Sequence, residues 1–231
     1  MNQYGFDGLE QKIGYIYKDK KLLRQAMTHT SFANEQKMNK LKSYERIEFL
    51  GDAILEMVSS EFFYFTYPDL PEGKLTQMRA SSVCEQALAI TARDLSLGSY
   101  MLLGKGEELT GGRDRDSIIA GVEAIIGSIY LDGGLAPAKD FILTHVLNDL
   151  EKKQLFYDAK SILQEKVQIG HLGNLSYKLI AEDGPDHAKH FAVEAWLDDT
   201  RIGSGEGHSK KLAEQHAAYQ ALLQMQAQET N

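Results

Sequence analysis

The sequence predicts an α+β protein of two domains, an all-α domain followed by a smaller domain of α-β-β-β-α order. Apolar residues recur at helical spacing as far as about residue 154. Beyond residue 158 two segments alternate in the manner of strands, and the last stretch is helical again. We place the domains at residues 1–154 and 158–228, which are both ordinary domain sizes.

The first domain is expected to contain several helices. Helical periodicity is evident at Leu22, Leu23 and Ala26, and it returns in the segment that begins at Tyr44. Proline and glycine cluster at residues 67–73 and 104–112, where we expect turns and not helix interiors.

The second domain is expected to begin and end with a helix. Ser209 has the side chain of an N-cap residue for the last helix. The expected elements are a helix at 161–168, strands at 176–180, 190–196 and about 201–205, and a helix at 209–226.

Composition limits where the chain acts and what it binds. With 25 Lys+Arg against 33 Asp+Glu the formal charge is −8, which argues against a simple basic arm that coats nucleic acid. The single cysteine, Cys84, cannot form an intramolecular disulfide, which favours a reducing, cytoplasmic location. We expect no membrane association, because no stretch approaches the ~18 apolar residues that a spanning helix needs.

The most informative segment is Tyr44-Glu-Arg-Ile-Glu-Phe-Leu-Gly-Asp-Ala-Ile-Leu55. On a helix, the carboxylates of Glu45, Glu48 and Asp52 project from one side, while apolar residues occupy the other. Such a row is either a solvated acidic stripe or a cation site, and carboxylate oxygens are ligands that suit Mg²⁺.

A second segment strengthens the interpretation as a metal site. Ser117-Ile-Ile-Ala-Gly-Val-Glu-Ala-Ile-Ile-Gly127 places one acid, Glu123, inside an apolar helical run, where charged groups are rarely left unpaired. If Glu123 faces the first acids, carboxylates from two helices would surround one or two ions. Such a site can activate water and neutralise charge on a phosphodiester. His29 could be a base, but it is more typical of a structural hydrogen-bonding residue at a helix end.

The second domain carries local features that suit a polyanion, although seven Lys+Arg against eleven Asp+Glu from residue 157 onward give it a net charge of −4. Lys210 and Lys211 open the last helix, whose N-terminus favours phosphate, although such lysines are often only solvated. His187 lies in a turn that presents it to a groove or merely closes a hairpin. The first helix offers side chains suited to the minor groove of A-form RNA at Gln164, Glu165 and Gln168.

These motifs together resemble bacterial ribonuclease III over nearly the whole chain. The segment Glu45-Arg-Ile-Glu-Phe-Leu-Gly-Asp52 is similar to the signature of that family. The second domain is similar to a double-stranded-RNA-binding domain through three segments, Asp158-Ala-Lys-Ser-Ile-Leu-Gln-Glu165, Gly184-Pro-Asp-His187 and Ser209-Lys-Lys-Leu-Ala-Glu214.

The resemblance implies an endoribonuclease that processes double-stranded precursors of ribosomal and messenger RNA. It implies an all-α nuclease domain that homodimerises, with Mg²⁺, or Mn²⁺ as a substitute, in each protomer. Each site would cut one strand and leave a 5′-phosphate and a 3′-hydroxyl. A phosphohydrolase acting on small nucleotides is disfavoured, because it leaves the second domain without a purpose.

Individual roles follow from the resemblance as well. Glu48, Asp52 and Glu123 would be metal ligands. Asp52, Glu123, Glu45 and Glu72 would be the catalytic residues, and Glu45 and Glu72 would line the valley around the metal. Phe49 would insert across the dimer interface, although on sequence alone it could equally be core. The RNA-binding residues would be Ser161, Gln164, Glu165, Gln168, His187, Lys210 and Lys211.

One departure from the family pattern separates two hypotheses. The family has an Asp and two further residues before the Glu, whereas here Ala120-Gly-Val-Glu123 is one residue short and lacks the fourth metal-binding carboxylate. Asp116, close to two helical turns before Glu123, is a poor substitute. The first hypothesis is a Mg²⁺-dependent endoribonuclease. The alternative is a dimeric double-stranded-RNA-binding protein whose cleavage is impaired or absent.

Overall fold

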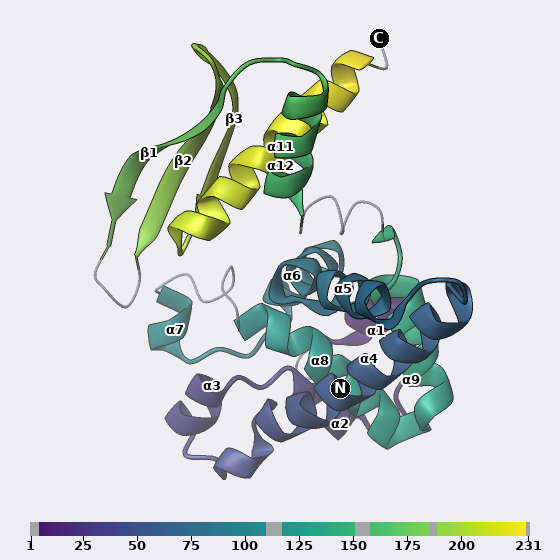
Figure 1. The fold of residues 1–231 in the computed structure, drawn as a ribbon. Helices are drawn as coiled ribbons and strands as arrows, with labels where there is room; N and C mark the ends of the chain where they lie inside the picture. The colour runs from purple at the N-terminus through teal and green to yellow at the C-terminus, as the bar shows by residue number, and fades with distance from the viewer. Residues whose placement is uncertain (1–4, 110–116, 151–157, 185–188, 230–231) are drawn as a thin grey trace. The chain divides into compact units, whose positions relative to one another are not determined.

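A computed structural model describes residues 5–109, 117–150, 158–184 and 189–229 (Figure 1). It divides the chain into two compact units, residues 1–149 and 150–231. The first unit is helical and the second combines a sheet with two helices, so the predicted α+β class is confirmed.

The first unit consists of helices that pack around one long helix, α8 (Ser117–Gly133). Its α-helices are α1 (Asp7–Ile13), α2 (Lys20–Ala26), α3 (Thr30–Glu35), α4 (Glu45–Thr66), α5 (Glu72–Val83), α6 (Glu85–Asp94), α7 (Lys105–Leu109), α8 (Ser117–Gly133) and α9 (Leu135–Phe141). Shorter turns are the 3-10 helices η1 (Lys40–Lys42) and η2 (Leu97–Ser99) and the π-helix η4 (Ile142–Val146).

The core of this unit lies where α8 meets its neighbours. Ile125, Ile126 and Ile129 of α8 are fully buried, as are Leu55 and Phe63 of α4. Both helices are long and carry an apolar face, so burial of those faces orders the domain. The acids of α4 therefore project from a well-packed scaffold.

Two glycines in the expected turns lie inside helices. Gly73 belongs to α5 and Gly106 to the short helix α7, so the prediction of turns throughout 67–73 and 104–112 was wrong at these positions. Tertiary hydrogen bonds hold the start of α7, because Glu35 Oε2 accepts from the Lys105 N–H at 2.7 Å. A glycine costs a helix only about 1 kcal/mol, which such contacts offset.

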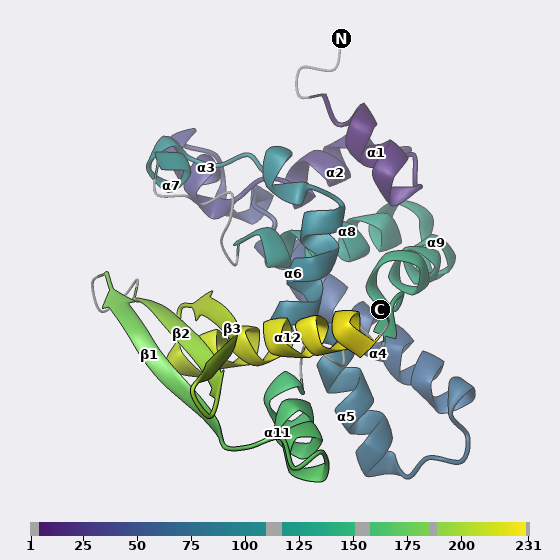
Figure 2. The same ribbon diagram turned by 90° about the horizontal axis from the view of Figure 1, so that it is seen from above.

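The second unit is a three-stranded antiparallel sheet covered on one face by two helices (Figures 1 and 2). Its elements are α11 (Ala159–Ile169), β1 (Leu175–Asp183), β2 (His190–Leu197), β3 (Thr200–Gly207) and α12 (Lys210–Glu229). The strands pair in the order β1-β2-β3. Ser209 caps α12 as expected, since its Oγ accepts from the Leu212 N–H at 3.2 Å.

Small residues seat α12 on the sheet. A Cβ atom on Gly203 would lie 2.3 Å from the Ala217 carbonyl oxygen, and one on Gly205 would lie 2.3 Å from the Ala217 nitrogen. Larger side chains would push the helix away, and the buried alanines of α12 complete the close fit. None of the described helices is both long enough and apolar enough to span a bilayer.

Candidate metal centre and RNA-binding surface

The centre of the first unit is a close, antiparallel contact between α4 and α8. A Cβ atom on Gly51 would lie 1.8 Å from the Glu123 carbonyl oxygen, and one on Gly127 would lie 2.2 Å from that of Ile47. Only glycine permits such an approach of two helix backbones. The contact fixes both the separation and the register of the two helices.

This register brings Glu123 to the acidic face of α4. Glu123 and Glu48 are half-buried, and Asp52 is exposed. Burial raises the pKa of the Glu123 carboxyl to about 7, and the charges of Asp52 and Glu48 act in the same direction, followed by that of Glu56. Burial also raises the pKa of Glu48, together with the neighbouring charges of Glu45 and Asp52. Carboxylates from two helices therefore influence one another directly.

Glu45 and Glu72, the two acids predicted at the periphery of the metal site, make different contacts. Glu45 begins α4, where its Oε1 accepts a hydrogen bond from the Thr30 hydroxyl at 3.0 Å, and its charge reaches Glu48. Glu72 begins α5, and its described hydrogen bond is to Thr76 of the same helix, at 2.8 Å. Among the described residues, Glu45 is thus joined to the other acids, whereas no contact joins Glu72 to them.

Glu48, Asp52 and Glu123 have the donor atoms that a divalent cation prefers, but they do not converge as closely as the ligands of a bound metal do. Hard oxygen donors and accumulated negative charge are what Mg²⁺ prefers, and it usually takes only one or two protein carboxylates and keeps several waters. In the parts of the chain that the structure describes, no three His, Cys, Asp or Glu side chains converge closely enough to hold a metal. The carboxylate oxygens of Glu48, Asp52 and Glu123 are nevertheless donors of the kind that such a cation takes.

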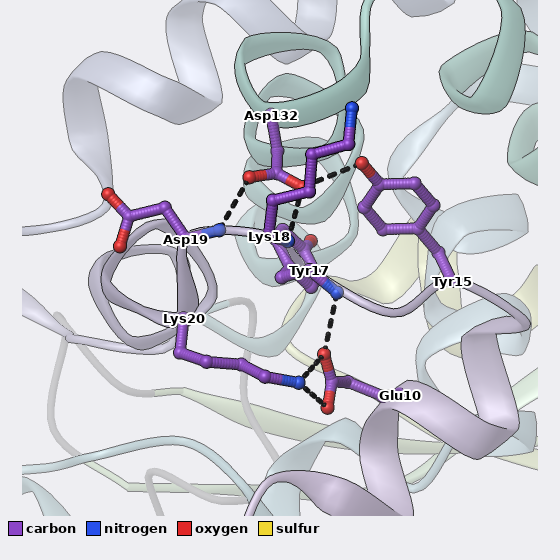
Figure 3. Close-up of polar contacts among 7 residues, drawn as sticks. All are labelled: Glu10, Tyr15, Tyr17, Lys18, Asp19, Lys20 and Asp132. Atoms are coloured by element: carbon purple, nitrogen blue, oxygen red, sulfur yellow. Dashed lines mark hydrogen bonds and ion pairs between the residues drawn. The ribbon is translucent and has the colours of Figure 1, made fainter.

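Hydrogen bonds from the segment between α1 and α2 anchor the C-terminal turn of α8 (Figure 3). Asp132 accepts from the Tyr15 hydroxyl at 2.7 Å and from the backbone N–H groups of Lys18 and Asp19 at 2.9 and 2.8 Å. One turn earlier, the Tyr17 hydroxyl lies 2.6 Å from the Ser128 Oγ in the interior. The helix that carries Glu123 is therefore fixed along its C-terminal half.

A buried carboxylate holds the same segment in place. Glu10 accepts from the Tyr17 N–H at 2.7 Å and pairs with the ammonium group of Lys20. Its burial is compensated by this pairing, as a buried charge requires.

The sequence departure near Ala120 lies N-terminal to all these anchors. Because the glycine contact and the hydrogen bonds of Asp132 fix Glu123 from the C-terminal side, a missing residue displaces what precedes it and not Glu123. Ala120 itself is half-buried on α8. Asp116, the considered substitute, lies outside the described residues.

His29 has the structural role that its position indicated. Its Nδ1 accepts from the Ser31 N–H at 3.1 Å and so caps α3. Burial lowers the pKa of His29, although the charges of Glu107 and Glu45 act in the opposite direction.

Phe49 lies on the outside of the described unit, so the alternative that it is a core residue was wrong. The residue is 80% exposed. Ala53, Met57 and Tyr64 follow at four-, four- and seven-residue intervals and are exposed as well, which puts all of them on one face of α4. This outer stripe of α4 is an apolar surface.

In the second unit, the predicted RNA-contacting residues of α11 share one exposed face. Leu163 and Val167 point into the core, while the opposite side of the helix is open. The exposed residues there are Ser161, Gln164, Glu165 and Gln168. His187 lies outside the described residues.

The two lysines at the start of α12 are also exposed. Lys210 lies 3.6 Å from Glu182 of β1, and Lys211 is exposed beside it. One turn along, Glu214 pairs with Lys160 at the start of α11. Lys160 therefore lies near the start of α12, a basic neighbour that the sequence pattern did not single out.

Glu56, whose charge acts on Glu123, was not predicted from the sequence. The available signal was spacing, because Glu56 follows Asp52 by four residues and continues the acidic row of α4. Its ion pair with Arg79 of α5, Nε to Oε2 at 3.0 Å, joins two helices and had no sequence signal.

Comparisons with known proteins define the class of this chain. A family model described as Ribonuclease-III-like matches residues 19–150, and one described as a double-stranded RNA binding motif matches residues 159–225. Both halves of the predicted architecture are thereby confirmed.

Relatives over the full length define the family. A protein named Ribonuclease 3 from Caldanaerobacter subterraneus subsp. tengcongensis is 47% identical over 94% of this chain and 96% of its own length. Another of that name, from Bacillus velezensis, is 44% identical over 97% of this chain and 92% of its own. The chain belongs to the ribonuclease III family.

A solved structure supports the same assignment for the first unit. The nuclease domain of ribonuclease III from Campylobacter jejuni matches with a TM-score of 0.57 and 39% identity, covering 62% of this chain and 96% of that one. The description of that structure concerns a region involved in dimer formation. The comparisons do not show the alternative of a binding protein with impaired cleavage.

Proposed function

We propose that this protein is a metal-dependent endoribonuclease specific for double-stranded RNA, with Mg²⁺ as its metal and Mn²⁺ as a substitute. The carrying observation is that Glu123, half-buried on α8, faces the acidic row of α4. Membership of the ribonuclease III family supports the reaction class.

The acids have distinct tasks in this proposal. Glu48, Asp52 and Glu123 would hold the cation, which when bound would activate a water and neutralise charge on the phosphodiester. Glu45, which accepts a hydrogen bond from Thr30, would add negative charge at the edge of the metal site. We assign Glu72 to the periphery of the same metal site on family resemblance alone.

The chemistry is a hydrolysis in which one bond forms and one breaks. The water oxygen would attack the phosphorus atom, and the bond from phosphorus to the 3′ oxygen would break. The 3′ oxygen would leave with a proton, so the products carry a 5′-phosphate and a 3′-hydroxyl.

The second domain would hold the duplex by shape. The exposed face of α11 suits 2′-hydroxyls and base edges in a shallow minor groove. Lys210 and Lys211 would contact phosphates at the N-terminus of α12, where the helix dipole also favours an anion. His187 would contact the next minor groove.

Single-turnover cleavage of a long RNA duplex in Mg²⁺ tests the proposal. Glu123→Gln should lower the rate by about a hundredfold or more while leaving RNA binding intact. Glu61→Gln is the control, since Glu61 lies later on α4 and pairs with Lys139.

A third variant, with an Asp inserted between Ala120 and Gly121, decides between cleavage and binding alone. Equal cutting with and without the insertion supports the nuclease. Binding by both, with cutting only by the insertion variant, would establish the alternative of a disabled nuclease.

We further propose that the protein is a homodimer joined through the outer stripe of α4. An apolar face that includes an aromatic residue at 80% exposure suits burial against a second copy, and Phe49 would insert there. Sedimentation velocity tests this. Phe49→Glu should give monomers, whereas Ile16→Glu, at a site 78% exposed in the segment between α1 and α2, should not. A dimeric Phe49→Glu protein would contradict the interface.

We also propose that the protein acts in the cytoplasm on precursors of ribosomal and messenger RNA. Family membership and the presence of a single cysteine support this. Depletion in the source organism should cause unprocessed ribosomal precursors to accumulate, measured by RNA sequencing of transcript ends.

A further inference from the structure

Glu214 is an acidic residue at a place where the proposed function needs positive charge. It follows Lys210 by four residues and Lys211 by three, so it lies one turn along α12 on the same side of the helix. An unpaired carboxylate there would repel the phosphates that the two lysines are proposed to contact. The group that neutralises Glu214 therefore bears on how the domain holds RNA.

Lys160 of α11 supplies the neutralising charge. Its ammonium group pairs with the Glu214 carboxylate, and the two side chains are 34% and 30% exposed. The pair is therefore partly shielded from water and salt, which makes it stronger than a fully exposed pair. It connects two helices whose exposed residues are both proposed to bind RNA.

The first strand of the sheet also holds Lys160. The Lys160 Nζ lies 4.9 Å from the ring centroid of Tyr177 on β1, which is a cation–π contact. Burial raises the pKa of Tyr177 to about 12, and the charge of Glu214 acts in the same direction. Side chains from α11, β1 and α12 thus surround one ammonium group.

Lys160 lies at the border of the exposed face of α11. It precedes Gln164 by one turn, whereas Leu163 and Val167 on its other side are buried. Its ammonium group is directed to Tyr177 and Glu214 and so toward α12. Lys160 is therefore placed to fix one edge of this face against α12.

The apolar contact between the two helices lies farther along α12. One buried cluster joins them, and its members are Ala159, Leu163, Val167, Ala218, Ala221 and Leu222. Ala218 lies about 10 Å beyond Lys211 along the helix axis, at about 1.5 Å per residue. Glu214 lies between that cluster and the lysines, so the ion pair extends the attachment of α11 toward the phosphate-binding end of α12.

We propose that the Lys160–Glu214 ion pair sets the position of the exposed face of α11 relative to Lys210 and Lys211, so that one RNA duplex contacts both. Lys160 and Glu214 are thus positioning residues. The inference rests on the proposed function, because it assumes that this face and the two lysines bind the same RNA. Without the pair, the two helix ends would adopt the RNA-binding arrangement for a smaller fraction of the time, and the affinity falls with that fraction.

The test is the affinity of the full-length protein for an RNA duplex of about 16 base pairs, the span of one such domain. Fluorescence anisotropy in EDTA measures it without cleavage. Lys160→Gln and Glu214→Gln should each weaken binding by about threefold or more. Glu214→Gln is the sharper variant, because removing a negative charge beside two lysines would tighten RNA binding if charge alone mattered.

Two further variants separate positioning from other causes. Lys160→Glu/Glu214→Lys restores the pair with its charges exchanged and should bind within about twofold of the wild type. Glu194→Gln is the control, since it loses an ion pair with Arg201 in the sheet and should change the affinity by less than about twofold. A purely structural role would lower the thermal midpoint and leave the affinity of the folded protein unchanged.

The outcomes distinguish this inference from the proposed function. Tighter binding by Glu214→Gln, or unchanged affinity in both single variants, overturns the positioning role and leaves the RNA-binding surface standing. Failure of the exchanged pair to restore affinity overturns the role of the pair. A wild-type protein that does not bind the duplex, or a Lys210→Ala/Lys211→Ala variant that binds it equally well, overturns both the inference and the RNA-binding surface of the proposed function.

Discussion

The pKa values of Glu123 and Glu48 in the helical domain and of Glu182 in the second domain are shifted in opposite directions. In the helical domain Glu123 is half-buried among other carboxylates, and burial raises its pKa to about 7. In the second domain Glu182 lies near the surface beside Lys189 and Lys210, and a hydrogen bond from Lys189 lowers the pKa of Glu182. Without a cation, ionisation of Glu123 and Glu48 therefore destabilises the helical domain, whereas the charge of Glu182 in the second domain is compensated. The difference indicates where a bound cation can act.

The two domains share one packing feature: in each, glycines allow the backbones of two neighbouring elements to come into direct contact. Gly51 and Gly127 bring two helices together in the first, and Gly203 and Gly205 bring a helix onto a strand in the second. In one case the contact assembles acids, and in the other it seats the helix that begins with Lys210 and Lys211.

The largest effect should come from breaking the glycine contact of the helical domain. Gly51→Ala places a methyl group against the Glu123 carbonyl, so the helices must separate at a cost of about 3 kcal/mol or more. Urea unfolding followed by far-UV circular dichroism should show the loss. The sole tryptophan, Trp196, reports on the second domain, and its fluorescence midpoint should not move.

Gly73→Ala is the control for this change. A Cβ atom at Gly73 meets nothing within 4 Å, so the variant should gain about 0.5–1 kcal/mol of helix stability. Equal destabilisation by both variants would contradict the role of the α4–α8 contact.

The next effect should appear in RNA affinity. The double variant Lys210→Ala/Lys211→Ala should weaken duplex binding by about tenfold or more. The slope of the logarithm of the binding constant against the logarithm of the salt concentration should become shallower by about 0.7–0.9 for each lost phosphate contact. Fluorescence anisotropy over a salt series measures both. Lys178→Ala is the control, since Lys178 stacks on Trp196 on the face of the sheet away from the helices. A larger loss in the control would place the RNA on the other face.

A smaller effect should appear in the stability of the metal-free protein. Because the folded pKa of Glu123 is about 7 and its ordinary value is 4.5, ionisation destabilises the fold increasingly between these values and fully above them. Glu123→Gln should therefore raise the thermal midpoint by a few degrees at pH 8, after allowance for solvent screening. The gain should vanish near pH 4. A pH-independent gain would contradict an electrostatic cause.

The smallest effect compares two buried tyrosine hydroxyls. Tyr17 bonds to Ser128 in the helical domain, so Tyr17→Phe should cost about 1 kcal/mol. The buried hydroxyl of Tyr177 in the second domain has no hydrogen-bond partner among the described residues, so Tyr177→Phe should be neutral or slightly stabilising. Denaturant midpoints measure both, and equal costs would remove the contrast.

Helical periodicity predicted the acidic face of α4 and the position of Glu123, because both depend on local spacing within one helix. The same reasoning could not reveal that Gly51 touches Glu123, since that contact joins segments far apart in sequence. It also missed the pairing of Arg79 with Glu56, which depends on how α5 packs on α4. Periodicity predicted which residues share one face of a helix. Which helix faces contact one another depends on tertiary packing, which periodicity does not report.

Alternation predicted β1 and β2, and the cap at Ser209 was confirmed, because both follow from local backbone requirements. The exposure of Phe49 could not be decided in the same way. An aromatic residue at that spacing suits a core and an interface equally, and only the path of the neighbouring helices leaves it outside.

The hydrogen bonds of Asp132 bear on the order in which the chain folds during synthesis. Its donors lie 113 to 117 residues earlier, in the segment from Tyr15 to Asp19. That segment leaves the ribosome long before Asp132 is synthesised. The first helices therefore remain partly exposed until the end of α8 has emerged and can accept their hydrogen bonds. The acids of the helical domain can therefore assemble only late in translation, after nearly all of that domain has emerged.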